Sequence, residues 1–253
     1  MLTGPQNSPA EKGDFAPVSK VSTKPPSIRA ANLGLVRDRA RLAAVQCGRD
    51  PQDIALIAVS KQQPATDIRE VAELGQRDFG ESYLQEALPK IEALRELGLT
   101  WHYIGHIQTN KTRLIANAFA WVHTVDRLKV AERLNEQREP ALGPLNVCLQ
   151  IKLADEPGKA GAAPQDVPTL AERVKLLPNL HLRGLMCIPP PVSKYDEQLA
   201  LFKRCAGVLA DLNNAGLRLD TLSMGMSDDL EAAIAAGATF IRIGTAIFGS
   251  REK

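Results

Sequence analysis

The chain contains a lysine placed where its amine can act as a nucleophile. Seven apolar or small residues, Ile54–Ser60, run directly into Lys61. A short run rich in isoleucine and valine predicts a strand that is buried on both faces, as in parallel sheets. Desolvation at the end of such a strand disfavours the charged ammonium form and favours a neutral amine that attacks carbonyl carbons. Taken alone, the same stretch also fits a lysine that reaches solvent along its aliphatic stem.

Two loops near the end of the sequence have the composition of a phosphate site. Three hydroxyl side chains in them can donate hydrogen bonds: Ser223, Ser227 and Thr245. Gly225 and Gly244 allow backbone N–H groups to approach an anion closely. A helix that we expect to begin near Asp228 would add the positive end of its dipole. Each loop alone is explained by turn glycines and an N-cap serine, whereas both loops on neighbouring strands favour phosphate binding.

The elements that position these groups alternate between strand and helix. The predicted strands are 54–61, 78–82, 101–106, 121–125, 145–153, 182–188, 221–225 and 240–243. A leading helix begins at Ser27, and further helices are predicted over about 66–74, up to 97, from 110, and over 126–138, 167–176, up to 213, and 228–236. We expect Asp126 to cap the helix that follows the fourth strand.

Eight strand-then-helix units in about 200 residues predict a (β/α)8 TIM-type barrel with an extra N-terminal helix. A doubly wound open sheet gives the same alternation, but the unit count and the lack of a G-x-G-x-x-G sequence after the first strand favour the barrel. In a barrel all strands end at one face, where the site lies. We therefore expect seven side chains near that rim: Lys61, Ser82, His106, Lys152, Met186, Ser223 and Arg242.

The predicted barrel narrows the chemistry of the ligand. Its first and eighth strands are neighbours, so Lys61 would face the phosphate-suited loops at close range. A ligand that joins an aldehyde or ketone to a phosphate satisfies both groups. Pyridoxal 5′-phosphate (PLP), held as a Schiff base on Lys61, is one such ligand. A sugar phosphate on a Schiff-base aldolase is the other.

Arg242 favours the first of these ligands. It lies two residues before Gly244 and therefore on the same face of its predicted strand. A guanidinium does not exchange protons near neutral pH, so it would hold a pyridine nitrogen as an unprotonated acceptor. A cofactor held in this way is a weak electron sink, which disfavours many carbanion reactions. Arg242 alone also fits a salt bridge to an acid inside the barrel.

Composition places the chain among ordinary globular proteins. It has 253 residues and a net charge of +2, so we expect no nucleic-acid or anionic-membrane surface. Its four cysteines and four histidines lack the spacing of a disulfide framework or a metal site, and we expect a cytoplasmic protein without a metal. Because the first 26 residues carry five prolines and few large apolar side chains, we expect 1–26 to be a disordered extension and 27–253 to form the barrel domain.

Several ordered motifs resemble one family, the pyridoxal phosphate homeostasis proteins. The motifs are Ala58–Lys61, Phe79–Glu86, Trp101–Lys111, His123–Asp126, Leu222–Asp229 and Arg242–Gly249. The resemblance extends over 27–249 and implies a fold-type III PLP barrel, similar to the N-terminal domain of alanine racemase. It implies that Lys61 carries the cofactor and that Arg242 faces the pyridine nitrogen. It also implies a set of phosphate-binding residues: Ser223, Ser227, Gly244 and Thr245.

Two positions depart from the pattern of this family. The family often has asparagine where this chain has Ser82, and again on the fifth strand where this chain has Lys152. Contacts with the cofactor ring are therefore not carried over to these two residues. We expect Lys152 to lie at the rim and to pair with Asp155 or Glu156.

The resemblance implies a role in PLP homeostasis rather than in catalysis. Alanine racemases need a second domain that supplies a tyrosine base, and we expect that domain to be absent because the sequence ends a few residues after the eighth strand. We predict a monomeric PLP carrier that buffers the cofactor or delivers it to apo forms of PLP-dependent enzymes, with no catalytic residue. A weak amino-acid racemase and the Schiff-base aldolase are the alternatives.

Overall fold

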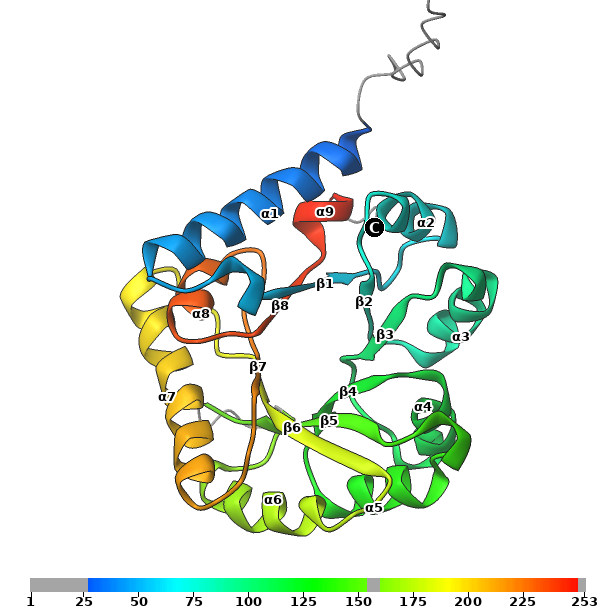
Figure 1. Cartoon of the computed structure of the whole chain (residues 1–253), viewed down its shortest axis with the longest axis vertical. Helices are drawn as coiled ribbons and strands as arrows, with labels where there is room; N and C mark the ends of the chain where they lie inside the picture. The colour runs from blue at the N-terminus through cyan, green and yellow to red at the C-terminus, as the bar shows by residue number, and fades with distance from the viewer. Residues whose placement is uncertain (1–26, 154–159, 250–253) are drawn as a thin grey trace, which may run out of the picture.

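The computed structural model describes residues 27–153 and 160–249, which form a barrel of parallel strands surrounded by helices (Figure 1). The predicted extension 1–26 lies outside the described residues. So do 250–253 and the pair Asp155 and Glu156, which we expected to contact Lys152.

Eight parallel strands close the barrel in chain order. They are β1 Ala55–Val59, β2 Asp78–Glu81, β3 Thr100–Tyr103, β4 Trp121–Val125, β5 Leu145–Ile151, β6 Leu180–Cys187, β7 Thr221–Ser223 and β8 Phe240–Ile243. Closure occurs where β8 pairs with β1, from Ala55 opposite Phe240 to Ala58 opposite Ile243. The closed barrel confirms the predicted fold class and rules out the open doubly wound sheet.

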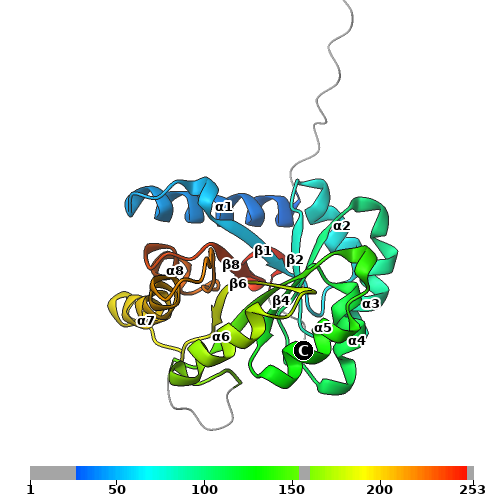
Figure 2. The same cartoon turned by 60° about the horizontal axis from the view of Figure 1, so that its bottom comes forward.

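Helices cover the outside of the barrel (Figures 1 and 2). They are α1 Ile28–Gln46, α2 Ala65–Glu73, α3 Leu84–Ala93, α4 Thr112–Ala118, α5 Leu128–Gln137, α6 Val167–Lys175, α7 Tyr195–Asn214, α8 Leu230–Ala235 and α9 Thr245–Phe248. Short 3-10 helices are η1 Pro51–Asp53, η2 Arg95–Leu97, η3 Thr109–Lys111, η4 Pro140–Leu142 and η5 Pro164–Asp166. Within 27–153 and 160–249, every helix is too short or too polar to cross a lipid bilayer.

The strands form because their side chains are suited to burial on both faces. Ile57 and Ala58 in β1 and Val122 in β4 have no exposed surface. The outer helices bury one face each, as α2 does with Ile68 and Val71. Full burial of one large apolar side chain contributes roughly 1.5–3 kcal/mol, so the layer between strands and helices is the main source of stability.

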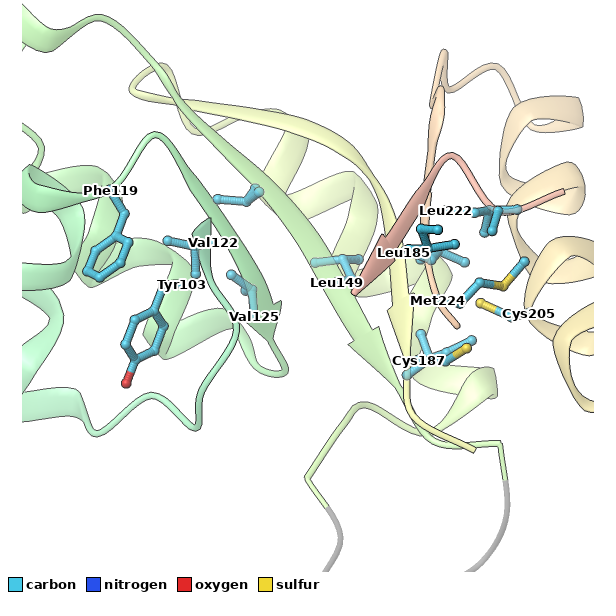
Figure 3. Packing of buried hydrophobic residues seen from close by; sticks show 14 of the residues in the cluster. Tyr103, Phe119, Val122, Val125, Leu149, Leu185, Cys187, Cys205, Leu222 and Met224 are labelled. Atoms are coloured by element: carbon cyan, nitrogen blue, oxygen red, sulfur yellow. The ribbon is translucent and has the colours of Figure 1, made fainter. Parts of the chain in front are cut away.

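The layer between β6, β7 and α7 lies close to the carboxyl ends of the strands (Figure 3). Cys187, at the end of β6, and Cys205 of α7 are fully buried, and the neighbouring Cys187 thiol together with burial raises the pKa of Cys205. Met224, directly after β7, lies beside them in the same layer (Figure 3). This packing fixes the strand ends from which the residues of the cavity extend.

The leading helix α1 confirms the predicted extra N-terminal helix and is held against the last part of the barrel (Figure 1). Its Leu33 is buried, and the Asn32 side-chain amide donates to the backbone oxygen of Ile247 in α9 at 3.1 Å. Arg39 forms an ion pair of 2.9 Å with Glu231 of α8. These contacts fix the segment from α8 to α9 relative to the barrel.

Two helix starts differ from the predictions, and one helix was not predicted. Arg127 occupies the N-cap of α5, and the predicted cap Asp126 forms an ion pair with it at 2.7 Å instead. α8 begins at Leu230, two residues later than predicted, since the Asp229 carboxylate turns back to accept from the Met226 N–H at 2.6 Å. The prediction missed α9, because its four residues are too few to show a helical repeat.

Candidate functional site

A cavity of about 500 Å³ opens at the carboxyl ends of the strands, a size typical of pockets for small cofactors. Its lining comes from several strand ends and from α1: Arg39, Val59, Lys61, Ser82, Ile104, Met186, Ile188, Met226, Ser227, Asp228, Arg242, Gly244, Thr245 and Ala246. The cavity brings together five of the six residues predicted to bind the cofactor: Lys61, Ser227, Arg242, Gly244 and Thr245.

Lys61 lies in a tight turn directly after β1. The Ser60 N–H donates to the Gly80 oxygen at 3.0 Å, which continues the pairing of β1 with β2 beyond the strand end. Gln62 has a φ of 63°, an unusual left-handed conformation for a residue with a side chain. Its N–H donates to a carboxylate oxygen of Glu86 in α3 at 3.0 Å, which holds the turn in place. Contacts with two neighbouring elements therefore direct the lysine to the cavity.

A buried ion pair lies next to this turn. The Glu81 side chain has no exposed surface, and its Oε1 accepts from Ser60 Oγ at 2.7 Å and from Lys90 Nζ at 3.0 Å. Lys90 also donates to the Ser60 backbone oxygen at 3.0 Å. Burial raises the pKa of Glu81 in spite of these partners. The pair joins α3 to the ends of β1 and β2 and so supports the backbone that carries the lysine.

Arg242 is fixed inside the barrel and reaches the cavity from β8. The residue is 4% exposed. Its Nη1 donates to Ser223 Oγ at 2.8 Å, and its Nη2 donates to the Cys187 backbone oxygen at 3.0 Å. Burial lowers the pKa of the guanidinium, but a guanidinium starts so high that it stays charged at neutral pH. Both of these acceptors are neutral, so the cation is held without being neutralised by them.

Ser223, the sixth predicted cofactor residue, lies deeper in the barrel than the other five. It is fully buried, and its hydroxyl lies between Arg242 and His123. It is not among the residues that line the cavity within the described ranges. Its direct contact with a phosphate therefore stays a prediction.

The phosphate-suited loops meet at the start of α9. Gly244 is the N-cap of this helix, and a Cβ atom there would lie 3.2 Å from the Val59 oxygen. Gly225 has a φ of 94°, and a Cβ atom there would lie 2.6 Å from the Cβ of Ala233. The first N–H groups of a helix have no acceptor inside the helix, and Thr245 adds a hydroxyl at the same point. The helix whose first residues line this cavity is α9, whereas α8 begins at Leu230, after the helix start predicted at 228.

We did not predict from the sequence that a second arginine, besides Arg242, lies at the cavity. Arg39 of α1 lines it, and its Nη2 donates to the Ser227 backbone oxygen at 3.1 Å. The ion pair with Glu231 holds the guanidinium in this position. Nothing in the sequence distinguishes Arg39 from the other arginines of the leading helix, because its role depends on how α1 packs.

The remaining rim residues are divided between three cavities. Ser82 and Met186 line the cavity that Lys61 lines. His106 lines a neighbouring cavity of about 230 Å³, which Ser82 also borders. Lys152 lines another of about 580 Å³, together with Asp166. His106 and Lys152 are therefore near the rim, as expected, but outside the cavity of Lys61.

Comparison with known sequences gives consistent matches over most of the chain. Residues 34–252 match the family model described as alanine racemase, N-terminal domain. The chain is 59% identical over 223 residues to the pyridoxal phosphate homeostasis protein of Pseudomonas aeruginosa, which covers 88% of this chain and 96% of that protein. It is 52% identical over 226 residues to the protein of the same name from Escherichia coli K12, with 88% and 97% covered.

Solved structures agree with these matches. The structure of PipY from Synechococcus elongatus PCC7942 with PLP bound is similar to this chain with a TM-score of 0.78 and 39% identity, covering 87% of this chain and 100% of that one. An alanine racemase from Clostridium difficile has a TM-score of 0.65 at 17% identity, covering 88% of this chain and 58% of that one. The second likeness demonstrates a shared fold alone.

Proposed function

Because the chain belongs to the family of the alanine racemase N-terminal domain and, within it, to the pyridoxal phosphate homeostasis proteins, we propose that it binds PLP as a Schiff base on Lys61. Its role is then to hold the cofactor and release it to other proteins. The observation that carries this proposal is the meeting of Lys61, Arg242 and Thr245 in one cavity. These three residues match an aldehyde, a pyridine nitrogen and a phosphate, which PLP combines.

The residues of the cavity suit the parts of PLP. When bound, PLP supplies an aldehyde carbon that a lysine amine holds covalently and reversibly. Lys61 Nζ is the proposed point of attachment. Arg242 orients the ring by donating a hydrogen bond without giving up its proton. The phosphate is assigned to the loops after β7 and β8, through Ser227, Gly244 and Thr245, whereas Ser223 acts through its bond to Arg242.

We propose that the protein is a carrier of PLP rather than an enzyme. Removing a proton from a substrate carbon and returning it on the opposite face takes two acid/base groups. The Lys61 amine can serve as one of them, and in the described part of the chain the cavity lining contains no tyrosine or histidine and a single carboxylate, Asp228, to serve as the other. A guanidinium at the ring nitrogen also limits the electron withdrawal on which most PLP reactions depend. These features support storage and transfer over turnover.

Absorption spectroscopy during titration with PLP tests the binding proposal. We expect the wild-type protein to develop the band of a protein-bound Schiff base near the visible edge, and Lys61→Ala to lack it. Lys152→Ala is the matched control and should keep the band, because its amine lines a different cavity. A wild-type band in Lys61→Ala would overturn the assignment, and a wild-type protein without any response to PLP would overturn the function.

Proton exchange in deuterated water separates the carrier from a racemase. The PLP-loaded protein is incubated with L-amino acids, and the α-proton signal is followed by NMR. We expect exchange no faster than that caused by free PLP at the same concentration. Exchange at enzymatic turnover rates would contradict the carrier and support the racemase.

We propose a monomer that transfers PLP to apo forms of PLP-dependent enzymes in the cytoplasm. The location is supported by four cysteines that are all free thiols. Reactivation of an apo-enzyme by the loaded protein, at a rate above that of spontaneous PLP release, would support delivery, and a rate equal to that release would contradict it.

A further inference from the structure

A chain of hydrogen bonds runs through the interior of the barrel and ends at Arg242. Asp78 Oδ1 is 2.9 Å from His102 Nε2, and His102 Nδ1 is 2.9 Å from His123 Nε2. His123 Nδ1 is 2.8 Å from Ser223 Oγ, which accepts from Arg242 Nη1 at 2.8 Å. The chain thus crosses the barrel from the first residue of β2, through β3, β4 and β7, to the residue of β8 that lines the cavity.

The two end groups of this hydrogen-bond chain, Asp78 and Arg242, fix the direction of every hydrogen bond between them. A guanidinium is a donor at all its nitrogens, and an ionised carboxylate only accepts. With neutral imidazoles, one assignment satisfies all four bonds: Arg242 donates to Ser223, which donates to His123 Nδ1. His123 Nε2–H then donates to His102 Nδ1, and His102 Nε2–H donates to Asp78. Both histidines are therefore the Nε2–H tautomer.

The surroundings of the two histidines keep them dry and neutral. Neither ring is exposed, and His102 stacks on Trp121 with ring centroids 5.8 Å apart. Phe240 packs edge-on against His102 at 5.4 Å and His123 at 5.7 Å. Burial lowers the pKa of both histidines, and the nearby Arg242 cation lowers that of His123 further. His102, His123 and Ser223 have no exposed surface, so the direction of the bonds between them depends on the protein groups at the two ends, Asp78 and Arg242.

We propose that Ser223, His123 and His102 are positioning residues that hold the Arg242 guanidinium at the cavity, and that Asp78 sets the direction of their hydrogen bonds from the other end of the barrel. The inference rests on the proposed function, in which Arg242 faces the PLP ring. The chain does not conduct protons to the cofactor, because the arginine at its end does not release one. Its effect is to keep Ser223 as a fixed acceptor for Arg242 before the cofactor arrives.

The test changes Asp78, which begins β2, is not among the residues that line the cavity, and has a side chain that is 31% exposed. In Asp78→Asn the end of the chain can both donate and accept, so the bonds lose their direction. Asp78→Glu keeps a carboxylate and is the rescue variant. Asp53→Asn, an exposed aspartate before the amino end of β1, is the matched control.

Nitrogen-15 NMR of the ligand-free protein reads the tautomers directly. We expect both histidines as Nε2–H in the wild type, Asp78→Glu and Asp53→Asn, and a mixture with Nδ1–H in Asp78→Asn. PLP should bind to Asp78→Asn more weakly, by up to about tenfold, because reversal of the bonds leaves the Ser223 hydroxyl hydrogen without its acceptor beside the Arg242 cation, while the other two proteins bind as the wild type does. In Ser223→Ala, PLP affinity should fall similarly while His123 stays Nε2–H, because Asp78 still orders it.

Two results would overturn the inference. One is a charged or Nδ1–H histidine at position 123 in the wild type. The other is an Asp78→Asn or Ser223→Ala protein that binds PLP with unchanged affinity. The NMR part needs no cofactor, so a wild-type protein that binds no PLP would refute the proposed function while the tautomers still decide the direction of the chain.

Discussion

Lys61 and Arg242 reach one cavity from neighbouring strands but are held in different ways. Arg242 is buried and donates to two neutral oxygens, so its position does not depend on a ligand. Lys61 is partly exposed in a turn whose left-handed residue is held by α3. A fixed guanidinium combined with a partly exposed lysine suits the proposed cofactor, which would bind in one orientation and leave again.

At this scale, Thr245→Val tests the phosphate assignment. The change removes one hydroxyl donor and keeps the shape of an exposed side chain. PLP should bind about tenfold more weakly, because a hydrogen bond to a charged group contributes roughly 1.5–3 kcal/mol. Titration followed by absorbance gives the dissociation constant.

The free energy of unfolding of Thr245→Val should change by less than about 0.5 kcal/mol. Thr66→Val, also exposed, should alter neither quantity, and unchanged affinity in Thr245→Val would remove Thr245 from the phosphate site.

Among the elements, most of the fold could be predicted because strands such as β1 are short apolar runs and because strands and helices alternate eight times. The predicted start of α5 was wrong because Asp126 forms an ion pair with Arg127 instead of capping the helix. The local sequence does not indicate which of these two contacts Asp126 makes. The contribution of Arg39 follows from the packing of α1 on α8, which sequence periodicity leaves open. The interior hydrogen bonds were missed for a related reason. The alternation of side chains along a strand can place His102 inside the barrel, but it does not predict which residue of another strand His102 contacts there.

The Glu81–Lys90 pair lets α3 be tested as a support for the ends of β1 and β2. Lys90→Met leaves the Glu81 carboxylate buried without its cation, which should cost about 3 kcal/mol of unfolding free energy at pH 8. The pKa of Glu81, already raised by burial, would rise further. The loss of unfolding free energy should therefore shrink as the pH falls from 8 through the raised pKa of Glu81 in the variant, because the protonated carboxyl no longer needs a cation. It should grow again as the pH rises through the same pKa.

Urea unfolding at several pH values measures this effect. Lys194→Met removes an exposed lysine paired with Glu197 and should change stability by less than about 0.5 kcal/mol at any pH. Equal effects of the Lys90 and Lys194 changes would mean that the buried pair does not support the strand ends.

At the scale of the whole molecule, the closed barrel encloses two neutral histidines, which makes its stability sensitive to mild acid. Burial lowers the pKa of His102 and His123 in the folded protein, whereas unfolded histidines take up protons below about pH 6.5. Stability is therefore retained above about pH 6.5 and lost as the pH falls toward the folded pKa values. Each histidine contributes up to about 1.4 kcal/mol per pH unit in this window.

Chemical unfolding between pH 7.5 and about 5.5 compares the wild type with two variants. His123→Gln should reduce the slope of stability against pH by about half of the histidine contribution. His181→Gln, which changes an exposed histidine at the start of β6, should leave the slope unchanged. Glu81 is present in all three proteins, so its opposite contribution cancels in the comparison. A His123→Gln protein with the wild-type slope would show that the interior histidine is not neutral.

Chemical trapping tests most directly whether Lys61 holds PLP, as we propose. Borohydride reduces a Schiff base to a stable secondary amine, so treatment of the PLP-loaded protein fixes the cofactor to its lysine. Digestion and peptide mass spectrometry then locate the added mass. We expect one modified peptide, with the modification at Lys61. An adduct at Lys90 or Lys152 in its place, or no adduct at all, would contradict it.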